Sequence, residues 1–385
     1  MHKKDDNQTT LGKKKFSLWA ELTSFDLFFF VLVIILLCIG LVMMFSSSYA
    51  SAYFKNNDSY YYIKKQLFWA AIGLAAMFIF SRINYNVWRI AALPLYAVSI
   101  ILLVLVKFIG KGNYEEQRWL VIGGVNIQPS EIAKFAIILI LAVYISINYS
   151  KMKKIYNGIL IPGAIIGVAA VLILIEPHLS GTLLVVAVGF ILLIIGGANL
   201  KFFAIAAVGA TASVAIFVVM KSGYMMDRIN IWLNPAADPL GKGFQPLQSL
   251  YAIGSGGIWG LGLGRSIQKY LYIPEPQNDY IFSIVCEELG FIGALIIIIL
   301  FALLVYRGFV IAWSAPDKFG SLLVIGITTL VAIQILLNIA VVTNTVPPTG
   351  ISLPFFSYGG TALTILLGEM GIILSVSRYS RLNKG

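Results

Sequence analysis

The chain has 385 residues, of which 59% are hydrophobic and only 12% carry a charged side chain. Soluble domains are nearer to a quarter charged, so this composition excludes an ordinary soluble protein and indicates a polytopic membrane protein. The net charge of +11 comes without any run that combines basic and aromatic residues, so we expect no nucleic-acid partner. The excess of Lys and Arg is instead typical of the cytoplasmic loops of a membrane protein.

Ten charge-poor apolar stretches of roughly spanning length follow one another along the chain. They predict an all-α protein with ten transmembrane helices, at residues 27–46, 66–81, 88–106, 129–149, 158–175, 182–198, 202–220, 280–306, 320–343 and 358–377. The expected organisation is a tail of residues 1–26, a single ten-helix domain of residues 27–377 and a tail of residues 378–385. A large loop of residues 221–278 separates the seventh and eighth helices.

The basic residues predict which side of the membrane each loop faces. The N-terminal tail, the even-numbered loops and the C-terminal tail carry 16 Lys and Arg residues, whereas the short odd-numbered loops carry 6. Because basic residues concentrate on the cytoplasmic side, we expect both tails in the cytoplasm and the loop 221–278 on the outer side.

Polar residues gather at the outer ends of several predicted helices, where burying a charge is expensive. Arg118 precedes the fourth helix, and Glu131 and Lys134 share one face of it at positions i and i+3. The segments "EPHLSG" (Glu176 to Gly181) and "PPTGISLPFFSYGG" (Pro347 to Gly360) interrupt the helices on the same side. Irregular backbone at membrane depth is tolerated where it lines a cavity, so we expect a charged outer cavity. A purely structural ion pair between Glu131 and Lys134 is an open alternative.

Three carboxylates, those of Asp279, Glu287 and Glu288, stand where the long loop turns into the eighth helix. If this stretch is one helix, Asp279 lies roughly 12 Å further out than Glu287 and about 80° away around the axis. We therefore expect a lone carboxylate at Asp279 and a structural role for the two glutamates. In the ninth helix, Gln334 and Asn338 at i and i+4 are expected to form hydrogen bonds between helices.

Two kinds of site are not predicted. The glycines between Gly254 and Gly264 have neither of the spacings that cradle nucleotide phosphates. His178 has no nearby His or Cys in the sequence, so no zinc site is expected, and the residues identify no other metal site.

Four stretches together resemble the SEDS family (shape, elongation, division and sporulation), whose members include FtsW, RodA and SpoVE. They are "RWLVIGGVNIQPSEIAKF" (Arg118 to Phe135), "NPAADPLGKGFQPLQSLYAIGSGGIWGLGLG" (Asn234 to Gly264), "YIPEPQNDYIFSIVCEELGFIG" (Tyr272 to Gly293) and "PPTGISLPFFSYGG" (Pro347 to Gly360). Their order and spacing cover nearly the whole chain. The segment "QKYLYIPEP" is more similar to the FtsW and SpoVE branch than to RodA.

The resemblance implies a peptidoglycan glycosyltransferase of the bacterial cytoplasmic membrane, acting in division or sporulation. Its substrate would be lipid II, the undecaprenyl-pyrophosphate disaccharide-pentapeptide, and its partner a class B penicillin-binding protein, which is a transpeptidase. Membrane lipids would surround the helices. The resemblance does not fix a cofactor, and it leaves room for a divalent cation such as Mg²⁺ or Mn²⁺.

The implied reaction inverts an anomeric carbon that carries a pyrophosphate, so one general base suffices. The resemblance assigns this role to Asp279. Together with the outer position of the polar residues, it gives an expected substrate-binding set of Arg118, Glu131, Lys134, Glu176, Gln245, Lys269 and Ser357, with Arg228 and Arg265 as further cations. Two positions depart from the family: His178 stands where an Asp is usual, and "YEEQ" (114–117) precedes Arg118 where small residues are usual.

Two other functions remain open on the sequence alone. A lipid II flippase would also carry intramembrane charges and broken helices. A non-catalytic scaffold for the transpeptidase would need the fold but not the cavity charges. The charges gather on the outer side and do not trace a path across the membrane, which favours the enzyme.

Overall fold

The computed structural model describes residues 25–110, 118–123, 125–176, 178–199, 230–241, 243–270 and 272–380. The seventh predicted helix (202–220), Arg228, residues 114–117, residues 1–24 and residues 381–385 lie outside this part. Within it, eight helices are long and apolar enough to cross a membrane, and a ninth apolar helix is shorter. The protein is therefore a multi-pass membrane protein, and the total of ten helices stays a prediction.

Nine of the predicted spans correspond to helices of the described part. They are α2 (Leu27–Asn56), α3 (Tyr61–Arg82), α4 (Val87–Ile109), α5 (Pro129–Asn148), α6 (Ile161–Ile175), α7 (Leu179–Ile195), α11 (Ile281–Trp313), α12 (Lys318–Val342) and α13 (Gly360–Tyr379). Short turns of helix precede α6 (Tyr156–Leu160) and follow α5 (Tyr149–Lys151). The large loop contains a short turn (Pro235–Ala237) and helix α10 (Phe244–Gly256), and an antiparallel hairpin of β1 (Leu120–Ile122) and β2 (Val125–Ile127) precedes α5.

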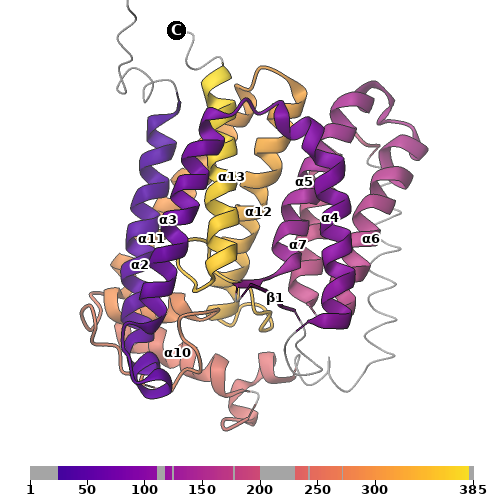
Figure 1. The fold of residues 1–385 in the computed structure, drawn as a ribbon. Coiled ribbons are helices and arrows are strands. Elements are labelled where there is room, and N and C mark those ends of the chain that lie inside the picture. Colours follow the sequence, from indigo (N-terminus) through magenta and orange to yellow (C-terminus); the bar gives the residue numbers. More distant parts are fainter. Residues whose placement is uncertain are drawn as a thin grey trace, which may run out of the picture.

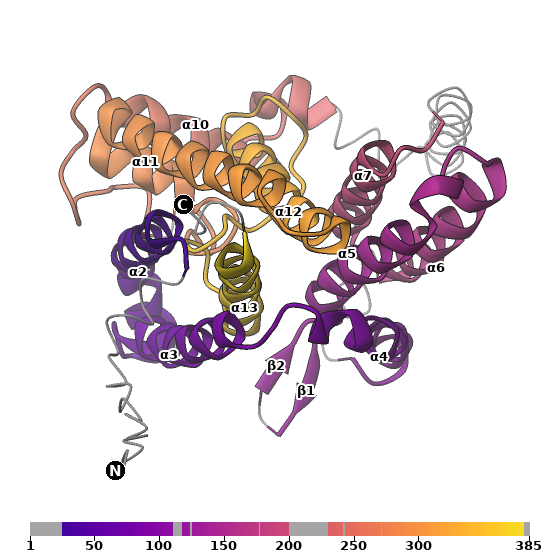
Figure 2. The ribbon, with the colours of Figure 1, turned by 90° about the horizontal axis from the view of Figure 1, so that it is seen from above.

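The first and last described helices meet at one end of the molecule (Figure 1). There the backbone N–H of Asp26 donates to Ser377 Oγ at 3.0 Å, and the Asp26 carboxylate forms an ion pair with Arg307 at 2.7 Å. Helix α10 and the β-hairpin lie at the other end, which we call the α10 end. Seen along the bundle, α13 is surrounded by neighbouring elements and packs closely against α3, while α4 packs against α5 (Figure 2).

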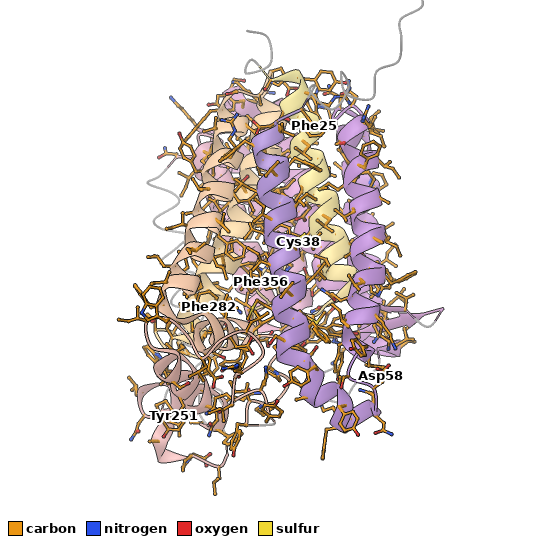
Figure 3. All side chains as sticks on the ribbon, turned by 90° about the vertical axis from the view of Figure 1, so that its left-hand side faces the viewer. Phe25, Cys38, Asp58, Tyr251, Phe282 and Phe356 are labelled. Carbon is orange, nitrogen blue, oxygen red and sulfur yellow. The ribbon has the colours of Figure 1, made fainter. Side chains whose placement is uncertain are left out.

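The burial of side chains separates helices inside the bundle from those at its surface. Helices α12 and α13 bury most of their apolar residues, whereas Ile90 and Phe108 of α4 stay largely exposed, as a lipid-facing surface requires. Phe282 and Phe356 are buried toward the α10 end, and Asp58 marks the exposed turn between α2 and α3 (Figure 3).

Helix α11 is interrupted at Gly290, whose φ of 68° and ψ of −171° are not helical. The backbone of residues 257–262 crosses α11 at this break, and a Cβ on Gly290 would lie 2.3 Å from the backbone nitrogen of Gly260. The crossing segment bonds the groups that the break exposes: Leu261 N donates to Glu287 O at 2.9 Å, and Phe291 N donates to Gly257 O at 2.9 Å. The glycine-rich stretch therefore permits close backbone contact.

The interruption corrects the expectation of one continuous eighth helix. Asp279 precedes the first helical residue, Ile281, and the axis changes at Gly290. The height and angle given for Asp279 and Glu287 applied to a regular helix through both residues, and Asp279 lies just outside the helix.

Candidate active site

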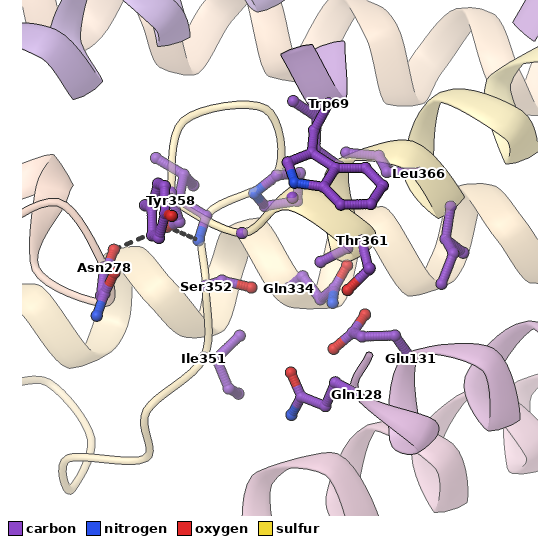
Figure 4. Close-up of a pocket in the computed structure, with 18 of the residues that line it drawn as sticks. Trp69, Gln128, Glu131, Asn278, Gln334, Ile351, Ser352, Tyr358, Thr361 and Leu366 are labelled. Atoms are coloured by element: carbon purple, nitrogen blue, oxygen red, sulfur yellow. Dashed lines mark hydrogen bonds between the residues drawn. The ribbon is translucent and has the colours of Figure 1, made fainter. Parts of the chain in front are cut away.

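A cavity of about 680 Å³ opens at the α10 end of the bundle. Its wall comes from α3, the β-hairpin, α5, α12, the segment around Asp279 and the loop that leads into α13 (Figure 4). This volume is within the usual range for small-molecule sites. Of the residues expected from the sequence to act on a substrate, Arg118, Glu131, Lys134, Asp279 and Ser357 line this cavity.

Three contacts fix the backbone around Asp279. Asn338 Nδ2 of α12 donates to Asp279 O at 2.8 Å and to Ile351 O at 2.6 Å. Ser357 Oγ donates to Asn278 O at 2.8 Å, and Tyr358 N donates to Gln277 O at 2.8 Å. The loop before α13 thus holds the segment that carries Asp279. Asn338 does join separate elements, but it joins α12 to two loops and not to another helix.

The carboxylate of Asp279 is partly exposed to the cavity, and no hydrogen bond or ion pair is formed with it within the described residues. Burial raises the pKa of Asp279 to about 6, Arg118 opposes this shift, and the nearby Glu275 adds to it. A carboxylate with such a pKa is ionised at neutral pH and still basic enough to accept a proton, which is the combination that general bases need.

Glu131 and Lys134 form an ion pair of 2.7 Å on one face of α5. Lys134 is 4% exposed and Glu131 14%, and both line the cavity. Glu369 of α13 is buried and lines the same cavity. The ion pair is therefore consistent with both interpretations of these residues. The same contact can stabilise the fold and can hold Lys134 in place to bind a ligand.

Glu176 and His178 flank the turn between α6 and α7. Burial raises the pKa of Glu176 to about 8, with Arg118 acting against the shift. Burial lowers the pKa of His178 to about 3, and Arg118 and Lys134 lower it further. Both groups are thus mainly uncharged at neutral pH. His178 lines the cavity, whereas Glu176 does not. Because His178 is uncharged, it adds no charge to the cavity at the position where an Asp is usual in the family.

Comparisons with known proteins identify the family. The profile of a family described as "Cell cycle protein", named for FtsW, RodA and SpoVE, matches residues 26–382. The chain belongs to this family. It is 42% identical to stage V sporulation protein E of Bacillus subtilis over 321 residues, which cover 83% of this chain and 87% of that protein. It is 41% identical to the probable peptidoglycan glycosyltransferase FtsW of Trichlorobacter lovleyi over 317 residues, covering 82% and 83%.

Solved structures of the FtsW/RodA/SpoVE family share the fold. A chain from a structure described as "Structural coordination of polymerization and crosslinking by a peptidoglycan synthase complex" superposes with a TM-score of 0.76 at 27% identity, covering 92% of this chain and 98% of that one. The rod shape determining protein RodA of Thermus thermophilus gives a TM-score of 0.66 at 24% identity and covers 93% and 98%. The latter likeness concerns the fold alone.

The structure places three residues of the expected substrate-binding set outside the cavity, namely Glu176, Gln245 and Lys269. Gln245 lies on α10 and does not line it. Lys269 is fully buried and pairs with Glu288 at 2.7 Å. We call its surroundings the Lys269 cluster, which consists of Ser46, Ser266, Lys269, Glu287 and Glu288.

The contacts of the Lys269 cluster favour the expected structural role of the two glutamates. Glu287 accepts hydrogen bonds from Ile267 N at 2.9 Å and from Ser266 Oγ. Glu288 accepts from Ser46 Oγ at 2.7 Å and from Lys269 Nζ. These bonds connect α2 and α11 to residues 266–269 of the large loop.

Three residues of the cavity region were not predicted. Gln66 of α3 contacts the loop before α13 by accepting from Gly359 N at 3.2 Å. Trp69 lines the cavity and lies on Gly360, where an added Cβ would approach the indole to 2.2 Å. Gln334 faces the cavity and, within the described residues, makes no hydrogen bond between helices, contrary to expectation. Only Gln334 had a sequence signal, a polar residue inside an apolar span.

The described residues contain no group of three or more His, Cys, Asp and Glu side chains that could hold a metal ion. No step in the function proposed below depends on such an ion.

Proposed function

We propose that this protein is a peptidoglycan glycosyltransferase that polymerises lipid II, with Asp279 as the general base. The observation that carries the proposal is the carboxylate of Asp279, which has a raised pKa and no hydrogen-bond partner within the described residues and is exposed to a cavity that also holds Arg118 and Lys134. The glycosyltransferase name of the FtsW relatives supports the reaction class.

In the proposed reaction, the hydroxyl oxygen of an acceptor sugar attacks the anomeric carbon of a lipid-linked donor. A carbon–oxygen bond forms to the acceptor, the bond to the pyrophosphate oxygen breaks, and its electron pair leaves with the pyrophosphate. Asp279 takes the proton of the acceptor hydroxyl. The leaving group departs as an anion, so no separate acid is needed. A positioned base of this kind typically contributes about 10²- to 10⁴-fold in rate.

Arg118 and Lys134 are the proposed partners of the pyrophosphate. The guanidinium of Arg118 offers a planar fork for phosphate oxygens, while Lys134 offers a point charge. Glu131 would orient Lys134 through their ion pair of 2.7 Å. We retain Glu176 and Ser357 as residues that support the site. Since Lys269 is fully enclosed by its own cluster, we assign it to the support of the large loop.

The cavity is proposed to open at the outer face of the bacterial cytoplasmic membrane, with both tails in the cytoplasm. The bias of Lys and Arg supports this orientation. Single cysteines at Lys153 and Gln245, in a protein without Cys38 and Cys286, should react with an impermeant thiol reagent from opposite sides. Labelling of both from one side would overturn the orientation.

A class B penicillin-binding protein is the proposed partner, and division or sporulation the proposed process. The structural likeness to a chain described as part of a peptidoglycan synthase complex supports the partner. The likeness to stage V sporulation protein E and to FtsW supports the process.

The experiment that tests the function separates an enzyme from a flippase. Purified protein is incubated with labelled lipid II, with and without the penicillin-binding protein, and the products are separated by length on a gel. We expect glycan strands of many disaccharides. If no strands form under either condition, while the protein moves labelled lipid II across liposome membranes, the transporter replaces the enzyme.

A further inference from the structure

Gln334 is a buried amide that lacks a protein partner. It is 7% exposed, it lines the cavity, and within the described residues no hydrogen bond is formed by its side chain. Figure 4 shows Gln334, Thr361 and Glu131 among the residues that line the cavity. Buried side-chain amides in proteins are almost always hydrogen-bonded, because an unsatisfied donor or acceptor is costly. A ligand in the cavity can supply the hydrogen bonds that the described residues do not give to Gln334.

The neighbours of Gln334 indicate an uncharged ligand group. Glu131 and Glu369 line the same cavity, and Glu131 already pairs with Lys134. The cations of the cavity, Arg118 and Lys134, are assigned to the pyrophosphate, so the position at Gln334 is left for an uncharged part of the substrate. Leucine side chains also line the cavity, at positions 330, 363 and 366. The surroundings therefore suit a polar but neutral group with a small apolar part.

An acetamido group has this chemistry. It carries one N–H donor, one carbonyl acceptor and a methyl group. A glutamine side chain carries an N–H donor and a carbonyl acceptor, so it can either donate to the acetamido carbonyl or accept from the acetamido N–H. The methyl group would then contact leucine. In ligand sites a small number of placed polar groups fix the orientation of the ligand, and Gln334 would be one of them.

We propose that Gln334 binds the acetamido group of one sugar of the substrate and selects for 2-acetamido sugars. The inference rests on the proposed function, since lipid II carries such a group on each sugar of its disaccharide. Trp69, held against Gly360, supplies an aromatic wall in the same cavity (Figure 4). Gln334 is then a specificity residue, distinct from the base Asp279.

The test compares lipid II with two analogues, each with one acetamido group replaced by a hydroxyl. Sites built to hydrogen-bond a substrate group reject analogues that lack it. We expect wild-type protein to use one of the analogues at least tenfold less well in kcat/KM. Gln334→Met, which has a similar size but no amide, should lose about tenfold on lipid II and less than twofold on that analogue. This non-additivity is the signature of a direct contact.

Gln248→Met is the matched control, because Gln248 lies on α10 and does not line the cavity. It should keep the wild-type ratio between lipid II and the analogue. If Gln334→Met does not fold, Gln334→Glu serves in its place, since it keeps an acceptor and loses the amide donor. Two results would overturn the inference. One is a Gln334 variant with the wild-type ratio of kcat/KM between lipid II and the analogue, and the other is a wild-type protein that uses both analogues as efficiently as lipid II.

The failure of this inference is distinguishable from the failure of the proposed function. Binding of the same three lipids is measured in detergent with wild type and Gln334→Met. If wild type makes no glycan, the enzyme is wrong, yet a tenfold preference in binding that disappears in Gln334→Met would still support the acetamido contact. If glycan forms and the preference is equal in both proteins, the enzyme stands and the contact is wrong.

Discussion

The Lys269 cluster and the cavity both hold polar side chains inside the bundle, and the two regions differ in how far these side chains are hydrogen-bonded. In the Lys269 cluster every charged group has its partners: Lys269 pairs with Glu288, and Glu287 accepts from two backbone N–H groups and a serine hydroxyl. In the cavity, the carboxylate of Asp279 and the amide of Gln334 have no hydrogen-bond partner within the described residues.

The difference shows that burial of charge alone does not mark a site. Glu288 is only 1% exposed, but it accepts hydrogen bonds from Ser46 and Lys269, so its carboxylate is not available to a ligand. Asp279 and Gln334 are positioned by other contacts of their segments while their own polar atoms stay available. Availability, together with a fixed backbone, is what separates a functional group from a structural one.

The strongest test of this contrast is Asp279→Asn. The amide keeps the size of the side chain and cannot take the proton, so we expect turnover of lipid II to fall by about 10²- to 10⁴-fold while binding changes little. Glycan formation and lipid II affinity are measured on the same preparation. Long strands made by Asp279→Asn at the wild-type rate would remove Asp279 from the mechanism.

The opposite pattern is expected for Glu288→Gln. Removing one partner leaves Lys269 charged and buried, and breaking a buried pair typically costs about 3–5 kcal/mol of stability. Thermal unfolding in detergent should detect this loss, whereas activity per folded molecule should largely survive. Asp58→Asn is the control, since its ion pair with Lys64 of 2.9 Å is exposed and such pairs contribute little to stability. A stable but inactive Glu288→Gln would place the Lys269 cluster in the catalytic machinery.

The pH dependence of activity gives a further test of the role of Asp279. With a pKa of about 6, Asp279 is ionised above that pH, so kcat/KM should rise as the pH increases through about 6 and fall roughly tenfold for each unit below it. The charge of Glu275 contributes to the raised pKa, so Glu275→Gln should move this acid limb to lower pH. The measurement is kcat/KM from pH 4.5 to 8 for wild type and Glu275→Gln. A limb that does not move in Glu275→Gln would belong to another group.

The sequence predicted much of the fold because apolar run length is a local signal. Nine of the ten spans correspond to helices of the described part, and the tenth lies outside it. The break at Gly290 was missed, since it depends on residues 257–262 crossing α11, a contact between distant segments. A run of apolar residues carries no information about such a crossing.

The candidate site was predicted less evenly. Asp279, Arg118, Glu131 and Lys134 were found because charge near a membrane is rare and because the family motif contains them. Lys269 has the same sequence signal, but it is enclosed by a cluster that only the fold assembles. Gln334 and Asn338 share one helical face in the sequence, yet Gln334 faces the cavity while Asn338 bonds to Asp279 O and Ile351 O.

The smallest expected effect concerns Ser357, which the sequence placed in the substrate-binding set. Its hydroxyl accepts from Leu353 N at 2.7 Å and donates to Asn278 O at 2.8 Å. Both of these bonds are internal, so Ser357→Ala should act by loosening the segment that carries Asp279. Net hydrogen-bond contributions are about 0.5–1.5 kcal/mol, so a loss of about two- to tenfold in kcat is expected, with KM unchanged. A raised KM at constant kcat would instead show direct contact with the substrate.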